Sequence, residues 1–354
     1  MKIAVYGISL NEAKHVKRWV KACAGADVLV VADTGSTDGT QSLLRDAGVQ
    51  VHEISVKPWR FDSARNTALN LVPDDVDVCV IVDIDEVPEP DFFKKLRKQW
   101  KKGSNRGWIY MDTGNVWVSD RIHTRHGFQW KYPIHEVPVP SMGTEVVSCS
   151  IDATIRHQPD NSKSRAQYLT MLEQAVQDDP KDQRMLVYLV REYGFHKRYE
   201  DVVRVAKKLD HSGWDVERAA ACRNAGDALV HLGKPEEALD WYEGGAEVLP
   251  DEPESWVALA QHHYFQKNWA DCNGASLKGL RTLPAKHYLA QPDSMFQLND
   301  FASLSSWELG WYGEAISYAN KAIAIKKDQR VLDNLAFYKK SIKTLSETVD
   351  MSAR

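Results

Sequence analysis

The first part of the chain alternates short apolar runs with amphipathic stretches. The apolar runs are rich in Val and Ile and predict buried strands over residues 3–8, 28–32, 49–54 and 78–84. Between them, apolar residues recur every three or four positions, which predicts helices over residues 12–24, 40–47 and 62–72. This succession is typical of a mostly parallel sheet with crossover helices. Strand patterns without helices at 107–118 and 144–155 predict additional strands and a mixed sheet, and we expect a long functional loop over 119–140.

After residue 164 the pattern becomes helical and repeats. Gly226 aligns with Ala260 and Pro250 with Pro284, each a shift of 34 positions, which is the tetratricopeptide period. We predict four repeats and a capping helix, at 183–216, 219–252, 253–286, 296–329 and 331–345. The predicted division is an α/β domain over 1–162, a linker helix over 163–182, and a repeat domain with its capping helix over 183–348. Repeats of this kind present a binding surface or simply stabilise or dimerise an attached domain.

Composition indicates an ordinary soluble protein. The chain has 354 residues, 43% of them hydrophobic, and a net charge of −4. Its apolar runs are shorter than the ~18 residues of a membrane span, and Lys14 and Lys17 argue against a signal peptide. Five cysteines without a C-x-x-C pair argue against a disulfide framework and a zinc site. We therefore expect a cytoplasmic protein without a membrane span, in which nucleic-acid binding is not indicated and only a local basic groove is left open.

One candidate motif, Asp33-Thr-Gly-Ser-Thr-Asp-Gly-Thr40, lies where a predicted strand gives way to a helix. Open parallel sheets bind ligands at the carboxyl ends of their strands, so Asp33 is a candidate nucleotide contact. The alternative is a plain strand-to-helix turn with good capping residues. Neither the G-x-G-x-x-G fingerprint nor the P-loop pattern occurs in the chain.

A second motif, Val80-Ile-Val-Asp-Ile-Asp-Glu-Val87, is an apolar strand that ends in carboxylates. Because side chains alternate along a strand, Asp83 and Asp85 point the same way. Two carboxylates at this edge form a hard oxygen site for magnesium or manganese, and hence for a diphosphate. The alternative is a solvated strand end.

Four motifs in this order resemble the family 2 glycosyltransferases of the GT-A fold over about residues 1–160: Ile8-Ser-Leu-Asn-Glu12, Asp33-Thr-Gly-Ser-Thr-Asp-Gly-Thr40, Phe61-Asp-Ser-Ala-Arg-Asn66 and Asp83-Ile-Asp-Glu86. The resemblance extends to a subgroup in which tetratricopeptide repeats follow the catalytic domain. It implies a Rossmann-like mixed sheet, a nucleotide-sugar donor, most often a UDP-sugar, and manganese or magnesium at the Asp-x-Asp motif. Inversion at the transferred sugar is also implied.

The Gln-x-x-Arg-Trp signature and the membrane helices of processive synthases are missing, so we expect non-processive transfer. The acceptor is unidentified. A peptide, protein or glycan held by the repeats and a repeat-mediated homodimer are both compatible with the sequence.

The resemblance also implies residue roles. Asp33 would recognise the base, Arg65 and Asn66 would face the nucleotide or diphosphate, Asp83 would approach the ribose or metal, and Asp85 would ligate the metal. The matching motifs add four nucleotide-sugar contacts: Ser9, Asn11, Glu12 and Ile84. His157 corresponds to a later histidine that completes the metal site, and a neutral imidazole suits manganese. For Arg65 the alternative is a salt bridge to a carboxylate such as Asp83.

Glu136 is the candidate general base, since an acceptor hydroxyl that attacks the anomeric carbon must give up its proton. Its alternative roles are acceptor orientation or a structural pair with His135 or Arg125. His135 and Trp130 are candidate acceptor or sugar contacts, and Trp130 reads equally as a core aromatic residue.

Two other functions compete with transfer. One is a tetratricopeptide scaffold or protein-binding module whose sugar-nucleotide domain has decayed; the site residues kept together argue against it. The other is a nucleotidyltransferase, which would need a glycine-rich basic loop near the amino terminus. Residues 6–12 offer one glycine and no arginine.

Overall fold

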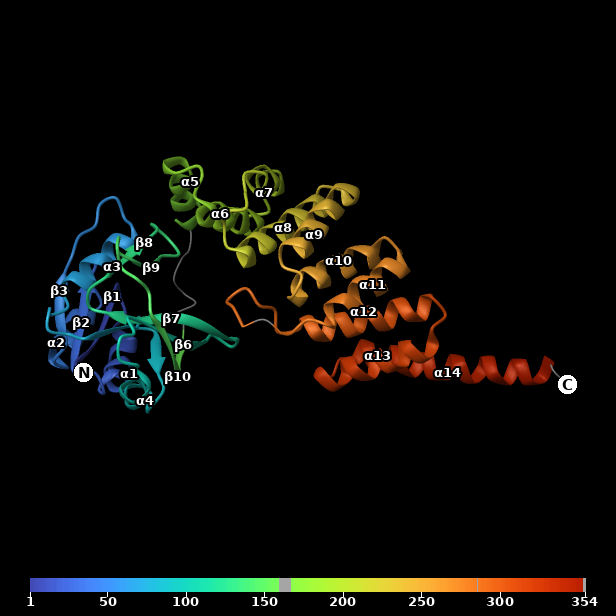
Figure 1. Ribbon diagram of the computed structural model, residues 1–354, viewed down its shortest axis with the longest axis horizontal. Helices are drawn as coiled ribbons and strands as arrows, with labels where there is room; N and C mark the ends of the chain where they lie inside the picture. The colour runs from blue at the N-terminus through green and yellow to red at the C-terminus, as the bar shows by residue number, and fades with distance from the viewer. Residues whose placement is uncertain (159–166, 285, 353–354) are drawn as a thin grey trace. The chain divides into compact units, whose positions relative to one another are not determined.

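The computed structural model describes residues 1–158, 167–284 and 286–352. They form two compact units (Figure 1), one of Met1–Ala175 with Lys286–Tyr288 and one of Val176–Ala285 with Leu289–Arg354. The predicted boundary between residues 162 and 163 lies outside the described residues.

The first unit is built on an eight-stranded sheet in the order β3-β2-β1-β4-β7-β6-β10-β5. Its strands are β1 (Ile3–Ser9), β2 (Val28–Asp33), β3 (Gln50–Glu53), β4 (Val78–Ile81), β5 (Glu86–Pro88), β6 (Arg106–Asp112), β7 (Val116–Thr124) and β10 (Ser148–His157). Strands β1 to β4 run parallel, whereas β7 is antiparallel to both β4 and β6. The predicted mixed sheet is therefore confirmed.

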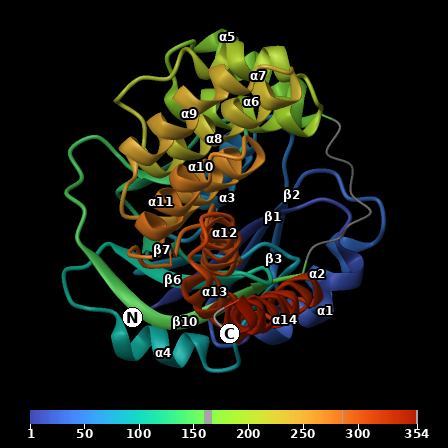
Figure 2. The ribbon, with the colours of Figure 1, turned by 90° about the vertical axis from the view of Figure 1, so that its right-hand side faces the viewer.

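Helices cover both faces of this sheet (Figure 2). The buried residues of α1 (Ala13–Cys23), α2 (Thr40–Asp46) and α4 (Phe92–Gln99) share one core on one face. Ala68 and Leu69 of α3 (Phe61–Asn70) belong to the core on the opposite face. On α1 the buried residues Val16, Trp19 and Cys23 recur at the three- and four-residue spacing of a helix that packs along one stripe.

The prediction of a long loop over 119–140 is wrong. This segment contains the end of β7 and a separate hairpin of β8 (Phe128–Lys131) and β9 (Val137–Pro140). Phe128 and Trp130 are buried and alternate with exposed Gln129 and Lys131, which is the two-residue period of a half-buried strand. Only residues 132–136 remain as the connection between the two strands.

The second unit consists of successive helical hairpins, which matches the predicted repeats. The hairpins are α6 (Gln183–Phe195) with α7 (Tyr199–Ala206), α8 (Asp215–His231) with α9 (Pro235–Val248), α10 (Pro253–Phe265) with α11 (Trp269–Gly279), and α12 (Ser294–Glu308) with α13 (Tyr312–Ile325). Helix α5 (Tyr168–Asp178) lies within the predicted linker helix, and α14 (Gln329–Ser352) follows the last hairpin. Gly226 lets α8 approach α9, because a Cβ there would lie 2.5 Å from the Tyr242 ring. Among the described residues, no helix is both long and apolar enough to cross a membrane.

Candidate functional site

The predicted site residues meet at the edge of the sheet where β1, β2 and β4 end. These parallel strands finish at Ser9, Asp33 and Ile81, so the segments that follow them emerge side by side. Helix α3 and the 132–136 connection add Arg65 and Glu136. Strand β10 adds His157 at its last position.

Asp33 organises the loop that follows β2. Its carboxylate accepts hydrogen bonds from the Ser9 hydroxyl at 2.6 Å, the Ser36 hydroxyl at 2.5 Å and backbone N–H at 2.8 Å, and the Gln41 amide at 2.7 Å. Burial alone would raise the pKa of Asp33, but these donors outweigh it and hold the pKa below its ordinary value. Asp33 is 0% exposed, and its carboxylate is engaged by these protein donors. The contact with a nucleotide base stays a prediction.

Asn11 and Glu12 tie the end of β1 to the same loop. The Asn11 side-chain oxygen accepts from the Thr37 backbone N–H at 2.8 Å, and the Glu12 backbone N–H donates to the Thr40 hydroxyl at 2.7 Å. Asn11 has φ 55°, a left-handed conformation that is uncommon outside glycine. Strained positions of this kind cluster at functional sites, which agrees with the place predicted for this motif.

Arg65 bridges two carboxylates at the centre of the site. Its guanidinium donates to both oxygens of Asp83, at 2.7 and 2.9 Å, and to Glu136 Oε1 at 2.5 Å. The same group lies 4.8 Å from the centroid of the Trp130 ring. The salt bridge to Asp83 considered as the alternative role of Arg65 is thus present. Glu136 pairs with Arg65 rather than with His135 or Arg125.

The pKa values of this group follow from burial and charge. Burial would raise the pKa of Asp83, but the Arg65 charge outweighs it and lowers the pKa to about 2. Burial likewise disfavours the Arg65 cation, but Asp83 and Glu136 raise its pKa well above the ordinary value. Both groups therefore stay ionised at neutral pH. Arg65 donates to Glu136 Oε1, and Oε2 has no hydrogen-bond partner among the described residues. No donor in that part of the chain therefore competes with a substrate hydroxyl for Oε2.

Glu86 and Arg121 are site residues to which the sequence assigned no role. Glu86 is 3% exposed, accepts from the Asp83 backbone N–H at 2.9 Å, and pairs with Arg121 at 2.9 Å. Burial is the main reason that the pKa of Glu86 rises to about 7. The pair fixes the turn between β4 and β5 that carries Asp83 and Asp85. Glu86 was visible in the motif, but Arg121 comes from β7, whose insertion beside β4 no local pattern reveals.

The two predicted metal ligands, Asp85 and His157, are in contact. His157 Nε2 lies 3.1 Å from Asp85 Oδ2, and both side chains are partly exposed. The hydrogen bond that His157 donates to Asp85 is the main reason that the pKa of His157 is raised. One carboxylate and one imidazole suit manganese, and hard cations take their remaining ligands from phosphate oxygens and water. Each Asp83 oxygen accepts one hydrogen bond from Arg65 and keeps a second lone pair, so the approach of Asp83 to the ribose or metal stays a prediction.

Charge in this region also favours a cation. The region holds four carboxylates and two guanidinium groups. Arg65 pairs with Asp83 and Glu136, Arg121 pairs with Glu86, and Asp85 contacts His157. Because the pKa of Glu86 is raised to about 7, this carboxyl is only partly charged at neutral pH, but the other three carboxylates still outnumber the two guanidinium groups. A divalent ion would neutralise such an excess of negative charge. The residues present therefore fit the metal that the resemblance implies.

The other predicted residues have structural partners. The Asn66 side chain bridges to the backbone of Trp130 at 2.9 and 2.8 Å, so it holds β8 against α3. Trp130 is 6% exposed and donates to the Tyr6 hydroxyl at 2.8 Å, which favours the core reading over sugar stacking. The Ile84 side chain lies in the core, so its backbone alone is available to a ligand. His135 has φ 54° beside Glu136 and its ring meets Tyr168 edge-on at 6.0 Å.

Comparison with known families supports both halves of the reading. Residues 8–161 match the model described as Glycosyl transferase family 2, and residues 298–329 match the tetratricopeptide repeat model. No curated protein matches the chain.

Similar solved structures include MamA, with 16% identity and TM-score 0.38 over 46% of this chain and 88% of that one. A TPR protein of Thermus thermophilus has 16% identity and TM-score 0.35 over 48% of this chain and 88% of that one. The first TPR of Spaghetti, solved with an HSP90 peptide, has 15% identity and TM-score 0.32 over 35% and 93%. On the two family models, the chain carries a glycosyltransferase family 2 domain over residues 8–161, followed by a tetratricopeptide repeat region.

Proposed function

We propose that the first unit transfers a single sugar from a nucleotide-sugar, most often a UDP-sugar, to an acceptor hydroxyl, with inversion and without processive extension. The observation that carries this proposal is the meeting of two groups at one sheet edge. Arg65 joins Asp83 to Glu136, and Asp85 contacts His157 at the strand end beside them. The first group contains a base, and the second contains cation ligands.

Asp85 and His157 would hold manganese or magnesium, and a bound cation supplies stabilisation of the charge on the departing diphosphate. Glu136 is the group that accepts the acceptor proton, through the oxygen that Arg65 does not engage. Arg65 holds Glu136 in place through its hydrogen bond to Oε1, while Glu86 and Arg121 hold the turn that carries Asp83 and Asp85.

The repeats give the acceptor a place in this proposal. Tetratricopeptide repeats usually present a protein-binding surface, so a peptide or protein acceptor fits best, with a glycan as the alternative. A homodimer through the repeats is compatible with the same role.

A transfer assay with the full chain, a panel of nucleotide-sugars and manganese tests the proposal. Asp85→Ala should abolish metal-dependent turnover, because one of two candidate ligands is lost. Glu136→Gln should retain donor binding and lose transfer. Asp46→Ala and Glu53→Gln, which change exposed carboxylates on α2 and β3, are matched controls and should behave as the parent chain.

Unchanged turnover in Asp85→Ala would remove Asp85 from the site, and unchanged transfer in Glu136→Gln would place the base elsewhere. A folded chain that turns over none of the donors would support the scaffold interpretation.

A further inference from the structure

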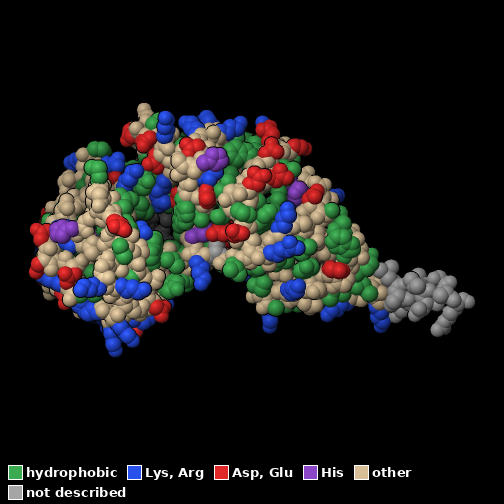
Figure 3. All heavy atoms as spheres, in the orientation of Figure 1, with side chains coloured by type: hydrophobic (Ala, Val, Ile, Leu, Met, Phe, Trp, Pro, Cys, Tyr) green, Lys and Arg blue, Asp and Glu red, His purple; other side chains and the backbone are tan. Residues whose placement is uncertain are grey.

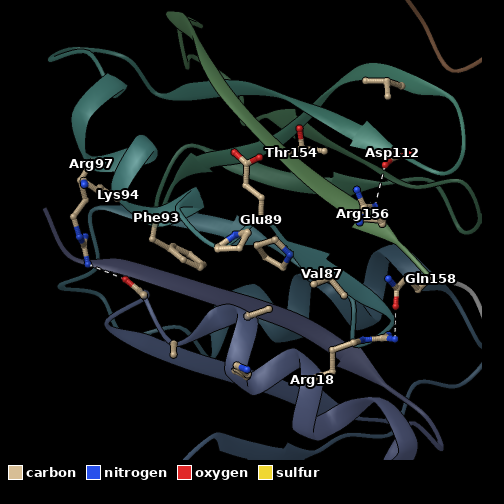
Figure 4. A pocket seen from close by; sticks show the side chains of 17 residues that line it. Arg18, Val87, Glu89, Phe93, Lys94, Arg97, Asp112, Thr154, Arg156 and Gln158 are labelled. Carbon is tan, nitrogen blue, oxygen red and sulfur yellow. Dashed lines mark hydrogen bonds and ion pairs between the residues drawn. The ribbon is translucent and has the colours of Figure 1, made fainter.

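A cleft of about 1120 Å³ lies on the face of the sheet covered by α1 and α4. One wall is α1 with the turn after it, the other is α4, and strands β5 and β10 pass between them (Figure 4). At one end the two walls meet, since Gly25 and Phe93 are so close that a Cβ on Gly25 would lie 2.9 Å from the Phe93 side chain. The volume exceeds the range of most small-molecule pockets.

The rim of this α1–α4 cleft is basic, although the whole chain carries a net charge of −4. Its charged lining residues comprise five cations and two carboxylates: Arg18, Lys21, Lys94, Arg97, Arg156, Glu89 and Asp112. Lys and Arg side chains also gather at the lower edge of the first unit, where α4 lies (Figure 3).

Part of this positive charge is neutralised internally. Arg156 pairs with Asp112 at 3.0 Å, Arg97 with Asp27 at 3.0 Å, and Glu89 with Lys95 at 2.7 Å. These ion pairs account for both carboxylates of the lining.

Three cations of the lining have no carboxylate partner among the described residues. Lys21 on α1 and Lys94 on α4 are exposed and form no ion pair within the described part of the chain. Arg18 donates to the neutral side-chain oxygen of Gln158 at 2.5 Å, and its buried Nε has no acceptor. An uncompensated cation therefore lies on each wall, and a third lies where α1 approaches β10.

The floor of the cleft is apolar and offers few backbone donors. Val87, Pro88 and Pro90 line it beside Phe93, and the two prolines have no N–H. Strand β5 is the last strand of the sheet, but with Pro88 it is a poor template for an added strand. Phe93 is 6% exposed, so the cleft presents no open ring on which a nucleotide base could stack. Recognition here depends on charge at the rim and apolar contact at the floor.

The cleft lies close to the candidate metal pair. Strands β5 and β10 both line the cleft, Asp85 directly precedes β5, and His157 is the last residue of β10. In the β5–β10 ladder Glu86 pairs with His157 and Val87 with Arg156, and successive side chains point to opposite faces. The Gln158 backbone N–H also donates to the Asp85 carbonyl at 2.9 Å. A ligand in the cleft would thus lie against Arg156 and Gln158, the two sequence neighbours of the candidate metal ligand His157.

We propose that the α1–α4 cleft binds an acidic peptide segment. Several carboxylates on one chain would meet the cations of both walls, and apolar side chains between them would cover the floor. A single small anion would leave most of this volume empty and reach only one wall. The proposal concerns binding and does not depend on sugar transfer.

Fluorescence anisotropy with the full chain tests it. The probe is a short fluorescein-labelled peptide of Glu, Leu and Ser, compared with the same peptide carrying Gln in place of Glu. We expect saturable binding of the acidic probe alone, weakening as salt rises. The double variant Lys21→Glu with Lys94→Glu should weaken it by about tenfold or more, because two attractive charges become repulsive.

The matched control is Lys17→Glu with Lys98→Glu, which makes the same charge change on the same two helices outside the cleft lining. It should leave the affinity unchanged, and a melting curve checks that both variants are folded. Equal loss in the two double variants, or equal binding of the Gln peptide, would overturn the proposal. Tighter binding of an anionic lipid vesicle or of a single-stranded RNA than of the acidic peptide would overturn it as well.

Discussion

Removal of Arg65 should destabilise the first unit strongly. The side chain is 9% exposed and makes three charge-assisted hydrogen bonds, at 2.5, 2.7 and 2.9 Å, to Glu136 and Asp83. Arg65→Ala leaves two neighbouring carboxylates without their shared cation. Breaking a buried ion pair by removal of one partner costs about 3–5 kcal/mol, and we expect that loss in the free energy of unfolding.

Part of the loss should depend on pH. Arg65 lowers the pKa of Asp83 from 3.8 to about 2, which corresponds to about 2.5 kcal/mol. That stabilisation is present above pH 3.8 and disappears as the pH falls towards 2. The difference between the parent chain and Arg65→Ala should therefore be largest near neutrality and shrink in acid.

Urea unfolding of the full chain, followed by hydrogen exchange and mass spectrometry of peptides from the first unit, measures this loss separately from the repeats. Arg45→Ala is the control, because Arg45 and Glu53 form an ion pair whose side chains are 48% and 65% exposed. Its cost should stay below about 1 kcal/mol. An Arg65→Ala loss no larger than that of the control, or equal at all pH values, would refute the reasoning.

Two further predictions concern the cores of the units. His123 is 1% exposed beside the Tyr6 hydroxyl, and burial lowers its pKa from 6.5 to about 4. Between these pH values His123 is protonated in the unfolded chain but neutral in the folded chain. Lowering the pH through this range should therefore reduce the free energy of unfolding by up to about 3 kcal/mol. His123→Gln should flatten this dependence in equilibrium unfolding, and an unchanged slope would contradict it. In the repeats, Gly226→Ala should cost about 1–3 kcal/mol through overlap with Tyr242. Gly244→Ala on α9, where a Cβ meets nothing within 4 Å, should raise the free energy of unfolding by about 0.5–1 kcal/mol. Equal effects in the two variants would contradict the packing argument.

The sequence predicts the frame of the site because its signals are local. An apolar strand followed by Asp83 and Asp85 places both carboxylates at a sheet edge, and a histidine at a later strand end falls beside them. The helical repeats are likewise visible in a fixed period. Residues with a local signal are therefore found without a structure.

Contacts set by strand order are not predictable in this way. Arg121 reaches Glu86, and His123 reaches Tyr6, because β7 inserts beside β4 in the antiparallel direction. The hairpin of β8 and β9 had an available signal, the alternation from Phe128 to Lys131, but the polar and aromatic composition of the region favoured a loop. The basic cleft combines residues from six separate elements, and no one of them is distinctive in sequence.

The most direct test of metal-dependent nucleotide-sugar transfer is a thermal-shift panel of UDP-, GDP-, CMP- and dTDP-sugars, each with and without manganese. A ligand that binds only the folded state raises the melting temperature by mass action. We expect one nucleotide class, the UDP-sugars, to raise the melting temperature only with manganese. We also expect Asp85→Ala to abolish this shift. A folded chain that responds to no nucleotide-sugar, or equally with and without manganese, would contradict it.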